Sequence, residues 1–440
     1  MIFRESIADE SPVELYSRLL SSGEDCFLLE SASGPRRSAR FSFLGSSPGA
    51  KAVYDGGRVS FDGSRSSARI DLFLKENMER RRPQRSMPFP YIGGFVGYFS
   101  YDTVRHFEKL PDRHPSSGFP DAELGLYTDG FIFDHLRGKR YYFSWDDDRE
   151  RNMLSNPRLE EEEGTPTIER GKAKGAFIES VEKAMEYIRD GDIFQVVLSR
   201  RTGIRGTRGM LPFYSALKRL NPSPYMYYVR SGDREVIGSS PETLVSVSGR
   251  KVVTHPIAGT RPVTGERGED ARLRRQLLAD EKERAEHNML VDLARNDVGR
   301  VCRYGSVTVP SYMKVEKYSH VQHIVSRVEG TLEKGKDAVD ALFSVFPAGT
   351  VSGAPKIRAM EIIDELEGCR RGPYAGAVGY YSFNGSLDSA ISIRTFFRQG
   401  SRAFLQAGGG IVNDSVPEKE YAETENKMGA LLEVFRRGRR

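Results

Sequence analysis

Residues 280–293 read DEKERAEHNMLVDL, and the rest of the chain can be interpreted as built around them. Asp280 can cap the N-terminus of a helix, and Glu283 stands three residues later, as in a capping box. Because residues three apart project from the same helix face, the carboxylates of Glu283 and Glu286 point the same way. Taken alone, such a pair is most often a solvated acidic face.

A second predicted helix changes that interpretation. Residues 415–418, SVPE, form a helix start, with the serine as cap and Pro417 in the first turn. Glu420, Glu423 and Lys427 follow on one face. Mg²⁺ is commonly held by one or two carboxylates together with the anionic groups of a substrate. Two helices that each offer a carboxylate pair, with an ammonium nearby, therefore predict a site for a hard divalent cation.

Composition and charge exclude several functional classes. The chain has 440 residues, of which 38% are hydrophobic and 29% charged, as is typical of a soluble globular protein. The net charge of +5 is mild and spread along the sequence, so we expect no nucleic-acid partner. We interpret the arginine-rich end, residues 436–440, as a solubilising tail.

Cysteine use and hydropathy predict a cytoplasmic location. Cys26, Cys302 and Cys369 lie far apart without a CxxC motif, which indicates a reducing compartment, no zinc site and no disulfide framework. The N-terminus MIFRESIADESP has no apolar signal region, and no run of about 18 apolar residues occurs. We therefore expect no membrane-spanning segment.

Three regions are predicted along the chain. Residues 151–174 are an acidic linker, because the glutamate run at 160–163 cannot bury a core. Residues 175–435 form a second domain. Residues 1–150 form a β-rich lobe, with strands expected at 26–31, 40–45, 91–99 and 141–145.

Polar residues interrupt several apolar segments of the second domain. Residues 192–200 form a strand that contains Gln195, which is either a satisfied core amide or a site residue. His323 lies on an apolar strand face, where a satisfied core histidine is the ordinary interpretation. Residues 238–242 and 256–261 are expected to be turns at strand ends.

Three features of the second domain could hold anions. Residues 346–356, FPAGTVSGAPK, are a glycine-rich turn that opens a helix with free backbone N–H groups. Arg394 ends an apolar strand as either a snorkelling edge residue or a carboxylate clamp. The glycines at 408–410 expose backbone just before the second carboxylate helix. Because no dinucleotide fingerprint or Walker A spacing occurs, the residues predict a Mg²⁺-dependent enzyme for a small, multiply anionic substrate.

Four longer motifs stand out in the second domain. They are PIAGTRP at 256–262, AEHNMLVDLARND at 285–297, FPAGTVSGAPK at 346–356 and AGGGIV at 407–412. Together and in this order, within a resemblance that covers nearly the whole chain, they are similar to the chorismate-utilising enzymes, and within that family to the anthranilate synthase large subunits. The resemblance implies an α+β fold, a sandwich of two large antiparallel β-sheets flanked by helices.

The reaction implied by the resemblance converts chorismate and ammonia to anthranilate and pyruvate in tryptophan biosynthesis, with Mg²⁺ as cofactor. Ammonia adds at ring C2 as the C4 hydroxyl leaves, and pyruvate is then eliminated. No cysteine of the chain lies in a glutaminase-like setting. The resemblance therefore implies a hetero-oligomer in which a separate glutamine amidotransferase subunit supplies the ammonia.

The resemblance also gives roles to individual residues. Glu286 and Glu423 would bind Mg²⁺ directly, with Glu283 and Glu420 behind them through water. His323 would protonate the leaving hydroxyl as imidazolium and take the C2 proton as neutral imidazole. The remaining implied site residues are Thr350 near the reacting hydroxyl, Lys427 beside Glu423, Tyr374, Arg394, Gly408, Gly409 and Gly410 at the enolpyruvyl carboxylate, and Ala258, Gly259 and Thr260 along the substrate.

Two positions distinguish members of the family. Isochorismate and salicylate synthases carry a lysine where this chain has Gln195, so ammonia is favoured over water as the nucleophile. Many 4-amino-4-deoxychorismate synthases carry a nucleophilic lysine where this chain has Ala258, so anthranilate is the favoured product. Two alternatives stay open: a 4-amino-4-deoxychorismate synthase component I of the folate pathway, and a catalytically silent amino-acid-binding regulatory subunit.

The last implied feature is a site for tryptophan as a feedback inhibitor. A free amino acid needs an acceptor for its ammonium group, a donor for its carboxylate and an apolar slot for its side chain. Glu30, Ser31, and Pro224 with Met226 offer these groups. The two stretches that resemble the family's inhibitor pocket consist of Leu29, Glu30 and Ser31, and of Pro224, Tyr225 and Met226.

Overall fold

The structure is a computed structural model that describes residues 1–23, 25–32, 40–79, 83, 87–159, 166–169, 171, 173–318 and 321–437. The glutamate run of the predicted linker, residues 160–163, and the last three residues of the arginine-rich tail lie outside the described residues. Within the described part, the strands form two antiparallel sheets of twelve strands each.

The first sheet joins the N-terminal strands to the C-terminal glycine strand. The short strand β20 (Gly353–Ala354) pairs with β12 at its edge. In spatial order the other strands are β1 (Ile2–Ile7), β10 (Lys139–Ser144), β9 (Asp129–Asp134), β3 (Phe41–Ser46), β2 (Asp25–Glu30), β13 (Tyr225–Ser231), β14 (Arg234–Ser240), β23 (Thr395–Gln399), β24 (Arg402–Ile411), β12 (Gln195–Arg205) and β11 (Thr167–Ile168).

The second sheet carries the strand that contains His323. Its strand β18 (Thr308–Lys317) pairs with β19 outside the main path. The other strands are, in order, β17 (Ile257–Pro262), β19 (Val321–Thr331), β16 (Lys251–Thr254), β15 (Thr243–Ser248), β22 (Leu387–Ile391), β21 (Ala377–Ser382), β7 (Gly94–Phe99), β8 (Ala122–Tyr127), β4 (Ala50–Asp55), β5 (Arg58–Phe61) and β6 (Ser64–Ser66).

The two sheets share one apolar core. Phe43 on β3 meets Tyr380 on β21, with ring centroids 5.6 Å apart, and Phe27 on β2 meets Tyr91 at 5.8 Å. Burial of such aromatic rings is the main favourable contribution to folding in a core of this kind. The predicted α+β sandwich is confirmed.

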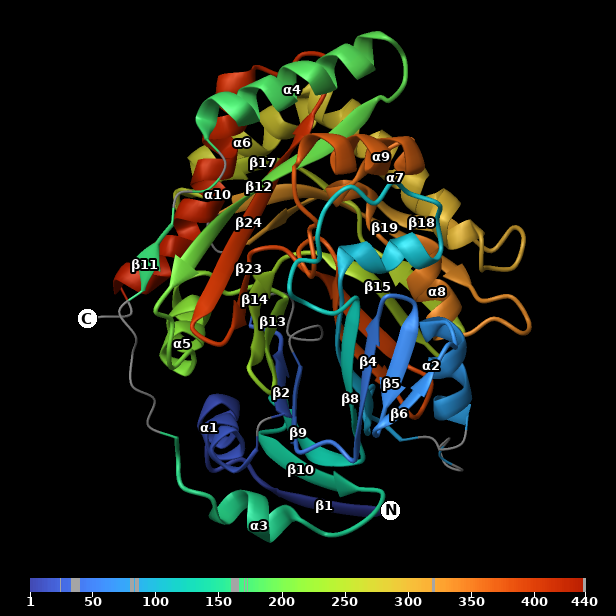
Figure 1. Ribbon diagram of the computed structural model, residues 1–440, viewed down its shortest axis with the longest axis vertical. Coiled ribbons are helices and arrows are strands. Elements are labelled where there is room, and N and C mark those ends of the chain that lie inside the picture. The colour runs from blue at the N-terminus through green and yellow to red at the C-terminus, as the bar shows by residue number, and fades with distance from the viewer. Residues whose placement is uncertain are drawn as a thin grey trace.

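Helices cover the sheets, and several gather at one end of the molecule. Figure 1 shows α4, α9 and α10 at the end opposite β1 and α3. No described helix is long and apolar enough to cross a membrane. The helices are α1 (Pro12–Ser22), α2 (Ile70–Glu79), η1 (Tyr101–His106), α3 (Glu150–Ser155), α4 (Lys174–Arg189), α5 (Leu211–Leu220), α6 (Arg267–Ala279), α7 (Glu281–Gly299), α8 (Ala338–Val345), η2 (Gly349–Val351), α9 (Lys356–Leu366) and α10 (Pro417–Arg437).

Both sheets cross the predicted boundary between the lobe and the second domain. In the first sheet β2 pairs with β13, and in the second sheet β7 pairs with β21. The strands expected at 26–31 and 40–45 correspond to β2 and β3, which pair with each other. The division at residues 151–174 stays a prediction about the organisation of the chain.

The segment 256–261 is a strand, so its prediction as a turn is wrong. Residues 257–262 form β17, whose register with β19 shifts between Ala258 and Arg261. Gly259 has φ +66°, a left-handed conformation that glycine adopts without the steric cost of a Cβ. The bulge breaks the alternation of apolar residues, which is why the sequence pattern indicated a turn.

Candidate active site

The two carboxylate helices begin where the sequence predicts. The Asp280 side chain accepts hydrogen bonds from the backbone N–H groups of Lys282 and Glu283 at the start of α7. Glu283 does not complete a capping box, since its Oε1 accepts a hydrogen bond from Arg261 at 3.1 Å. Helix α10 begins at Pro417, as expected.

The carboxylates of both helices converge on the glycine strand β24. A Cβ at Gly409 would lie 3.3 Å from Oε2 of Glu420 and 3.9 Å from Oε1 of Glu423. A Cβ at Gly410 would lie 2.5 Å from Nε2 of Gln195 and 3.8 Å from Oε1 of Glu286. A side chain at position 410 would therefore collide with Gln195, and bare backbone faces the acidic groups.

Direct hydrogen bonds orient two of the carboxylates. Gln195 Nε2 donates to Glu286 Oε1 at 2.9 Å. Lys427 Nζ lies 2.7 Å from Glu423 Oε1 and donates to the carbonyl oxygen of Gly408 at 2.9 Å. The predicted contact of Lys427 with Glu423 is therefore present, and it ties α10 to β24.

The electrostatics of the carboxylates fit a divalent cation. Burial raises the pKa of Glu286, and the neighbouring Glu283 and Glu423 raise it further. Burial and Glu423 likewise raise the pKa of Glu420. Among the described residues, no three His, Cys, Asp or Glu side chains form a ready metal cluster. The protein would thus supply one or two ligands and leave the rest to water and substrate oxygens, which is the usual arrangement for Mg²⁺.

The surroundings of His323 favour its neutral imidazole form. Its Nδ1 lies 2.7 Å from the carbonyl oxygen of Gly259, which can only accept, so Nδ1 carries the proton. Thr260 Oγ1 is 3.2 Å from the same nitrogen. Burial lowers the pKa of His323, and the cationic Arg394 and Lys427 lower it further. The other ring nitrogen, Nε2, is left as an acceptor.

Glu242 is a site residue that the sequence analysis missed. It follows the end of β14, and only 8% of its surface is exposed. Burial raises its pKa from 4.5 to about 7, while the Thr350 hydroxyl, Arg394 and Lys427 oppose that rise. These neighbours place Glu242 among the predicted site residues. A carboxyl buried within reach of two cations is a candidate for proton transfer near neutral pH.

The residues expected to hold a carboxylate lie on neighbouring segments. Tyr374 is 3% exposed, and a Cβ at Gly408 would lie 3.0 Å from its hydroxyl oxygen. Arg394 lies between β22 and β23, and its guanidinium is close enough to the Glu242 carboxyl to interact with it electrostatically. Ala258 is buried beside Ile324 on β19. A guanidinium can form a two-bonded fork with a ligand carboxylate.

Most of the chain matches one family model. The model described as chorismate binding enzyme covers residues 24–433. The chain belongs to the chorismate-binding enzyme family. This result confirms the family resemblance of the four motifs.

Relatives and solved structures of the family agree with that placement. The chain is 47% identical to anthranilate synthase component 1 of Methanothermobacter marburgensis, over 98% of this chain and 94% of that protein. It is 44% identical to the protein of the same name from Thermus thermophilus, over 97% and 95%. The crystal structure of anthranilate synthase component I from Streptococcus pneumoniae has a TM-score of 0.81 at 38% identity, covering 91% of this chain and 93% of that chain. The menaquinone-specific isochorismate synthase of Escherichia coli shares the fold, with a TM-score of 0.77 at 20% identity over 98% and 94%.

In this chorismate-binding enzyme, the two stretches predicted to bind tryptophan lie side by side. Met226 pairs with Glu30 across β13 and β2. Glu30 Oε2 accepts a hydrogen bond from Tyr214 at 2.6 Å, and Lys218 Nζ lies 2.8 Å from Oε1. The Tyr225 hydroxyl is bonded elsewhere, to Asp388. The predicted ammonium acceptor therefore already has an internal cation.

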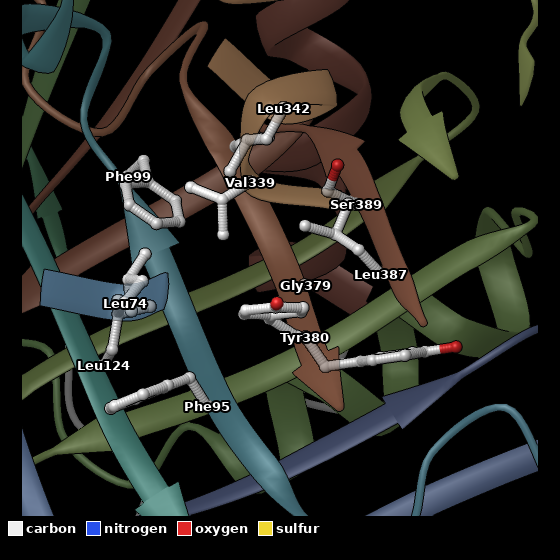
Figure 2. A pocket seen from close by; sticks show the side chains of 12 residues that line it. Leu74, Phe95, Phe99, Leu124, Val339, Leu342, Gly379, Tyr380, Leu387 and Ser389 are labelled. Atoms are coloured by element: carbon white, nitrogen blue, oxygen red, sulfur yellow. The ribbon is translucent and has the colours of Figure 1, made fainter. Parts of the chain in front are cut away.

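A separate apolar pocket does not suit a substrate of this family. Figure 2 shows Leu74, Phe95, Val339 and Leu342 pointing into it, and no charged side chain lines it. An anionic ligand would find no cation there to offset its loss of hydration. We interpret this pocket as a packing gap between the second sheet, α2 and α8.

Proposed function

We propose that this chain is the synthase subunit of an anthranilate synthase, which converts chorismate and ammonia to anthranilate and pyruvate. The observation that carries the proposal is the setting of Gln195. Its Nε2 is bonded to Glu286, while its buried Oε1 has no hydrogen-bond partner among the described residues. A buried acceptor of this kind requires a donor, and an N–H of ammonia supplies one. The names of the relatives at 44–47% identity support the same activity.

The proposed cofactor is Mg²⁺. Glu286 and Glu423 would bind it directly, with Glu283 and Glu420 behind them through water. Burial and, to a smaller extent, neighbouring carboxylates raise the pKa values of Glu286 and Glu420, and a bound cation would oppose both effects. When bound, the ion would supply positive charge for the ring carboxylate of chorismate.

The second carboxylate of chorismate, on the enolpyruvyl group, would be held by the chain itself. Arg394 offers a guanidinium beside Glu242, and Tyr374 lies against the strand that carries Gly408 and Gly409. Backbone N–H groups of that strand would donate to the same carboxylate. Ala258 and Thr260 would line the substrate on the side of β17.

Glu242 and His323 would divide the proton transfers between them. In the first step ammonia adds at C2 and Glu242 donates its proton to the C4 hydroxyl, which leaves as water; Thr350 would hydrogen-bond near that hydroxyl. In the second step His323 Nε2 takes the C2 proton as the bond between the ring and the enolpyruvyl oxygen breaks, so that the ring becomes aromatic. The enolate that leaves takes a proton from the imidazolium at its methylene carbon and is released as pyruvate. Glu242 thus takes over the acid role implied for His323, because burial and two cations hold that imidazole neutral.

A glutamine amidotransferase is the proposed partner, because no cysteine of the chain has a nucleophile's setting. Burial raises the pKa of all three thiols, Cys26, Cys302 and Cys369. A raised pKa opposes formation of the nucleophilic thiolate. The three cysteines are all free, in keeping with the cytoplasmic location that we propose.

The decisive experiment is a turnover assay of the purified chain with chorismate, Mg²⁺ and ammonium salt at alkaline pH, where NH₃ is abundant. We expect fluorescent anthranilate with one pyruvate per turnover, and no turnover when glutamine replaces ammonium. Formation of aminodeoxychorismate without pyruvate would support the folate-pathway alternative. Absence of any turnover would support a silent regulatory subunit.

Tryptophan is the proposed feedback inhibitor, bound where β2 meets β13. Glu30 would accept its ammonium group, which requires Lys218 to share or leave that carboxylate. Ser31 would donate to its carboxylate, and Leu29, Pro224 and Met226 would surround the indole ring. Binding would compete with the present arrangement of Glu30, which gives tryptophan a means to shift the local structure.

A further inference from the structure

Arg371 and Glu367 form a fully buried ion pair on the connection between α9 and β21. Their side chains are 1% and 2% exposed. Arg371 Nε donates to Glu367 Oε2 at 2.9 Å and Nη2 donates to Oε1, so the two groups form a fork. Burial of two charges has a large desolvation cost, and a buried pair is therefore weak evidence for stability alone. The remaining contacts of the pair indicate another role.

Arg371 bonds two elements of the proposed active site. Its Nη1 donates to the carbonyl oxygen of Val351 at 2.6 Å, directly after Thr350 on η2. Its Nη2 also donates to the carbonyl oxygen of Val197 at 2.7 Å, and Val197 pairs with Gly410 across β12 and β24. One guanidinium thus connects the Thr350 turn to β12, the strand that pairs with the glycine strand β24.

Glu367 bonds to β12 as well, two residues further along that strand. Its Oε1 accepts hydrogen bonds from both the backbone N–H and the hydroxyl of Ser199, each at 2.7 Å. Ser199 pairs with Gly408. The guanidinium carbon of Arg371 also lies 5.6 Å from the ring centroid of Tyr374, within the range of a cation–π contact.

We propose that the Arg371–Glu367 pair is a positioning device, which fixes Thr350, the Gly408–Gly410 backbone and Tyr374 relative to one another. The inference rests on the proposed function, because these are the groups proposed to contact chorismate. They lie on three segments that are distant in sequence. The pair bonds directly to η2, contacts Tyr374, and bonds to β12, which in turn pairs with the glycine strand. A misplacement of about 1 Å in such groups can lower a rate by about 10²-fold.

A second buried pair provides a matched control. Arg234 donates to Glu123 through Nε and Nη2, both at 2.8 Å, and forms the same fork. The Glu123 side chain is 1% exposed and that of Arg234 22%. This pair joins β14 to β8 and, within the described part of the chain, makes no hydrogen bond to a proposed site residue. Loss of either fork should reduce stability, whereas only the first should disturb the site.

The experiment compares Arg371→Lys and Glu367→Gln with Arg234→Lys and Glu123→Gln in the full chain. For each variant we would measure the melting temperature, and kcat and KM for chorismate with ammonium. We expect the first two to lose at least about 10-fold in kcat/KM well below their melting temperature, and the control pair to stay within about 2-fold. The proposal would be overturned if kcat/KM fell in proportion to the drop in melting temperature, and did so equally in the variants of both pairs. If Glu367→Gln does not fold, Ser199→Ala removes a single hydrogen bond to Glu367 and takes its place.

A double-mutant cycle provides a readout that a purely structural role would not change. If Arg371 acts through Thr350, the double variant Arg371→Lys/Thr350→Val should lose less transition-state stabilisation, measured from kcat/KM, than the sum of the losses in the two single variants. Additive losses would overturn the proposal. If the wild-type chain shows no turnover, the proposed function fails by itself. Calorimetry of chorismate binding then tests the pair, with affinity expected to fall about 10-fold in Arg371→Lys and to persist in Arg234→Lys.

Discussion

Glu242→Gln should make the protein more stable and less active at the same time. The Glu242 carboxyl is 8% exposed, and burial raises its pKa from 4.5 to about 7. Glutamine keeps the size of the side chain and much of its hydrogen bonding, but it has no charge to desolvate. The substitution therefore isolates the free energy that the buried carboxyl costs the folded chain.

The size of the effect follows from the two pKa values. Above pH 4.5 the unfolded chain loses the Glu242 proton, while the folded chain keeps it up to about pH 7. Because the folded state binds more protons in that window, this residue lowers the free energy of unfolding as the pH rises. The resulting reduction in the free energy of unfolding is about 1 kcal/mol near pH 5 and about 3 kcal/mol near pH 8. In Glu242→Gln, which has no carboxyl at this position, this pH-dependent loss of stability should be absent.

Urea unfolding of the wild type and of Glu242→Gln, near pH 5 and near pH 8, measures the difference directly. We expect the stability advantage of the variant to grow by about 2 kcal/mol between the two pH values. Turnover with ammonium should fall by about 10²–10⁴-fold. Glu242→Asp, which keeps an ionisable group, serves as the control and should retain the pH dependence. If the variant were more stable than the wild type by the same amount at both pH values, the raised pKa of Glu242 would be refuted. Normal turnover of the variant would refute the role of Glu242 as the acid.

The other proposed roles are tested by substitutions at five positions. Glu286→Gln or Glu423→Gln should abolish turnover at millimolar Mg²⁺ without a change in the circular dichroism spectrum, because each removes a metal ligand; near-normal activity would contradict the metal assignment. His323→Ala should lose about 10²–10⁴-fold in rate while chorismate still binds, and an unfolded variant would indicate a core histidine instead. Ser31→Ala or Met226→Thr should relieve tryptophan inhibition and spare the uninhibited rate. Calorimetry that finds tryptophan binding unaffected by saturating chorismate would exclude the coupling.

The parts of the site that depend on local spacing could be predicted from the sequence. Glu283 with Glu286, and Glu420 with Glu423, share a face because residues three apart do so on every helix. The contact of Lys427 with Glu423 follows from the spacing of four. The three glycines of β24 were recognisable because bare backbone is required wherever other groups approach closely.

The parts that depend on burial could not be predicted in this way. Glu242 follows Pro241 at the end of β14, and nothing nearby in sequence indicates that Thr350 and Arg394 surround it. Arg371 likewise follows Arg370 in a polar stretch, although one is 1% exposed and the other bonds Asp112 at the surface. Segments far apart in the chain decide which of two adjacent charges is enclosed.

The proposed tryptophan site and the proposed active site are connected by β22. At one end of this strand Asp388 Oδ1 accepts a hydrogen bond from Tyr225 at 2.9 Å, and burial raises the pKa of Asp388 to about 6. The strand ends at Ile391, three residues before Arg394, whose φ of +51° holds it in the left-handed region. Tryptophan can inhibit only if it binds an inactive arrangement better than the active one. A shift of β13 on binding would move β22 through Tyr225, and the guanidinium proposed to hold the enolpyruvyl carboxylate would move with it.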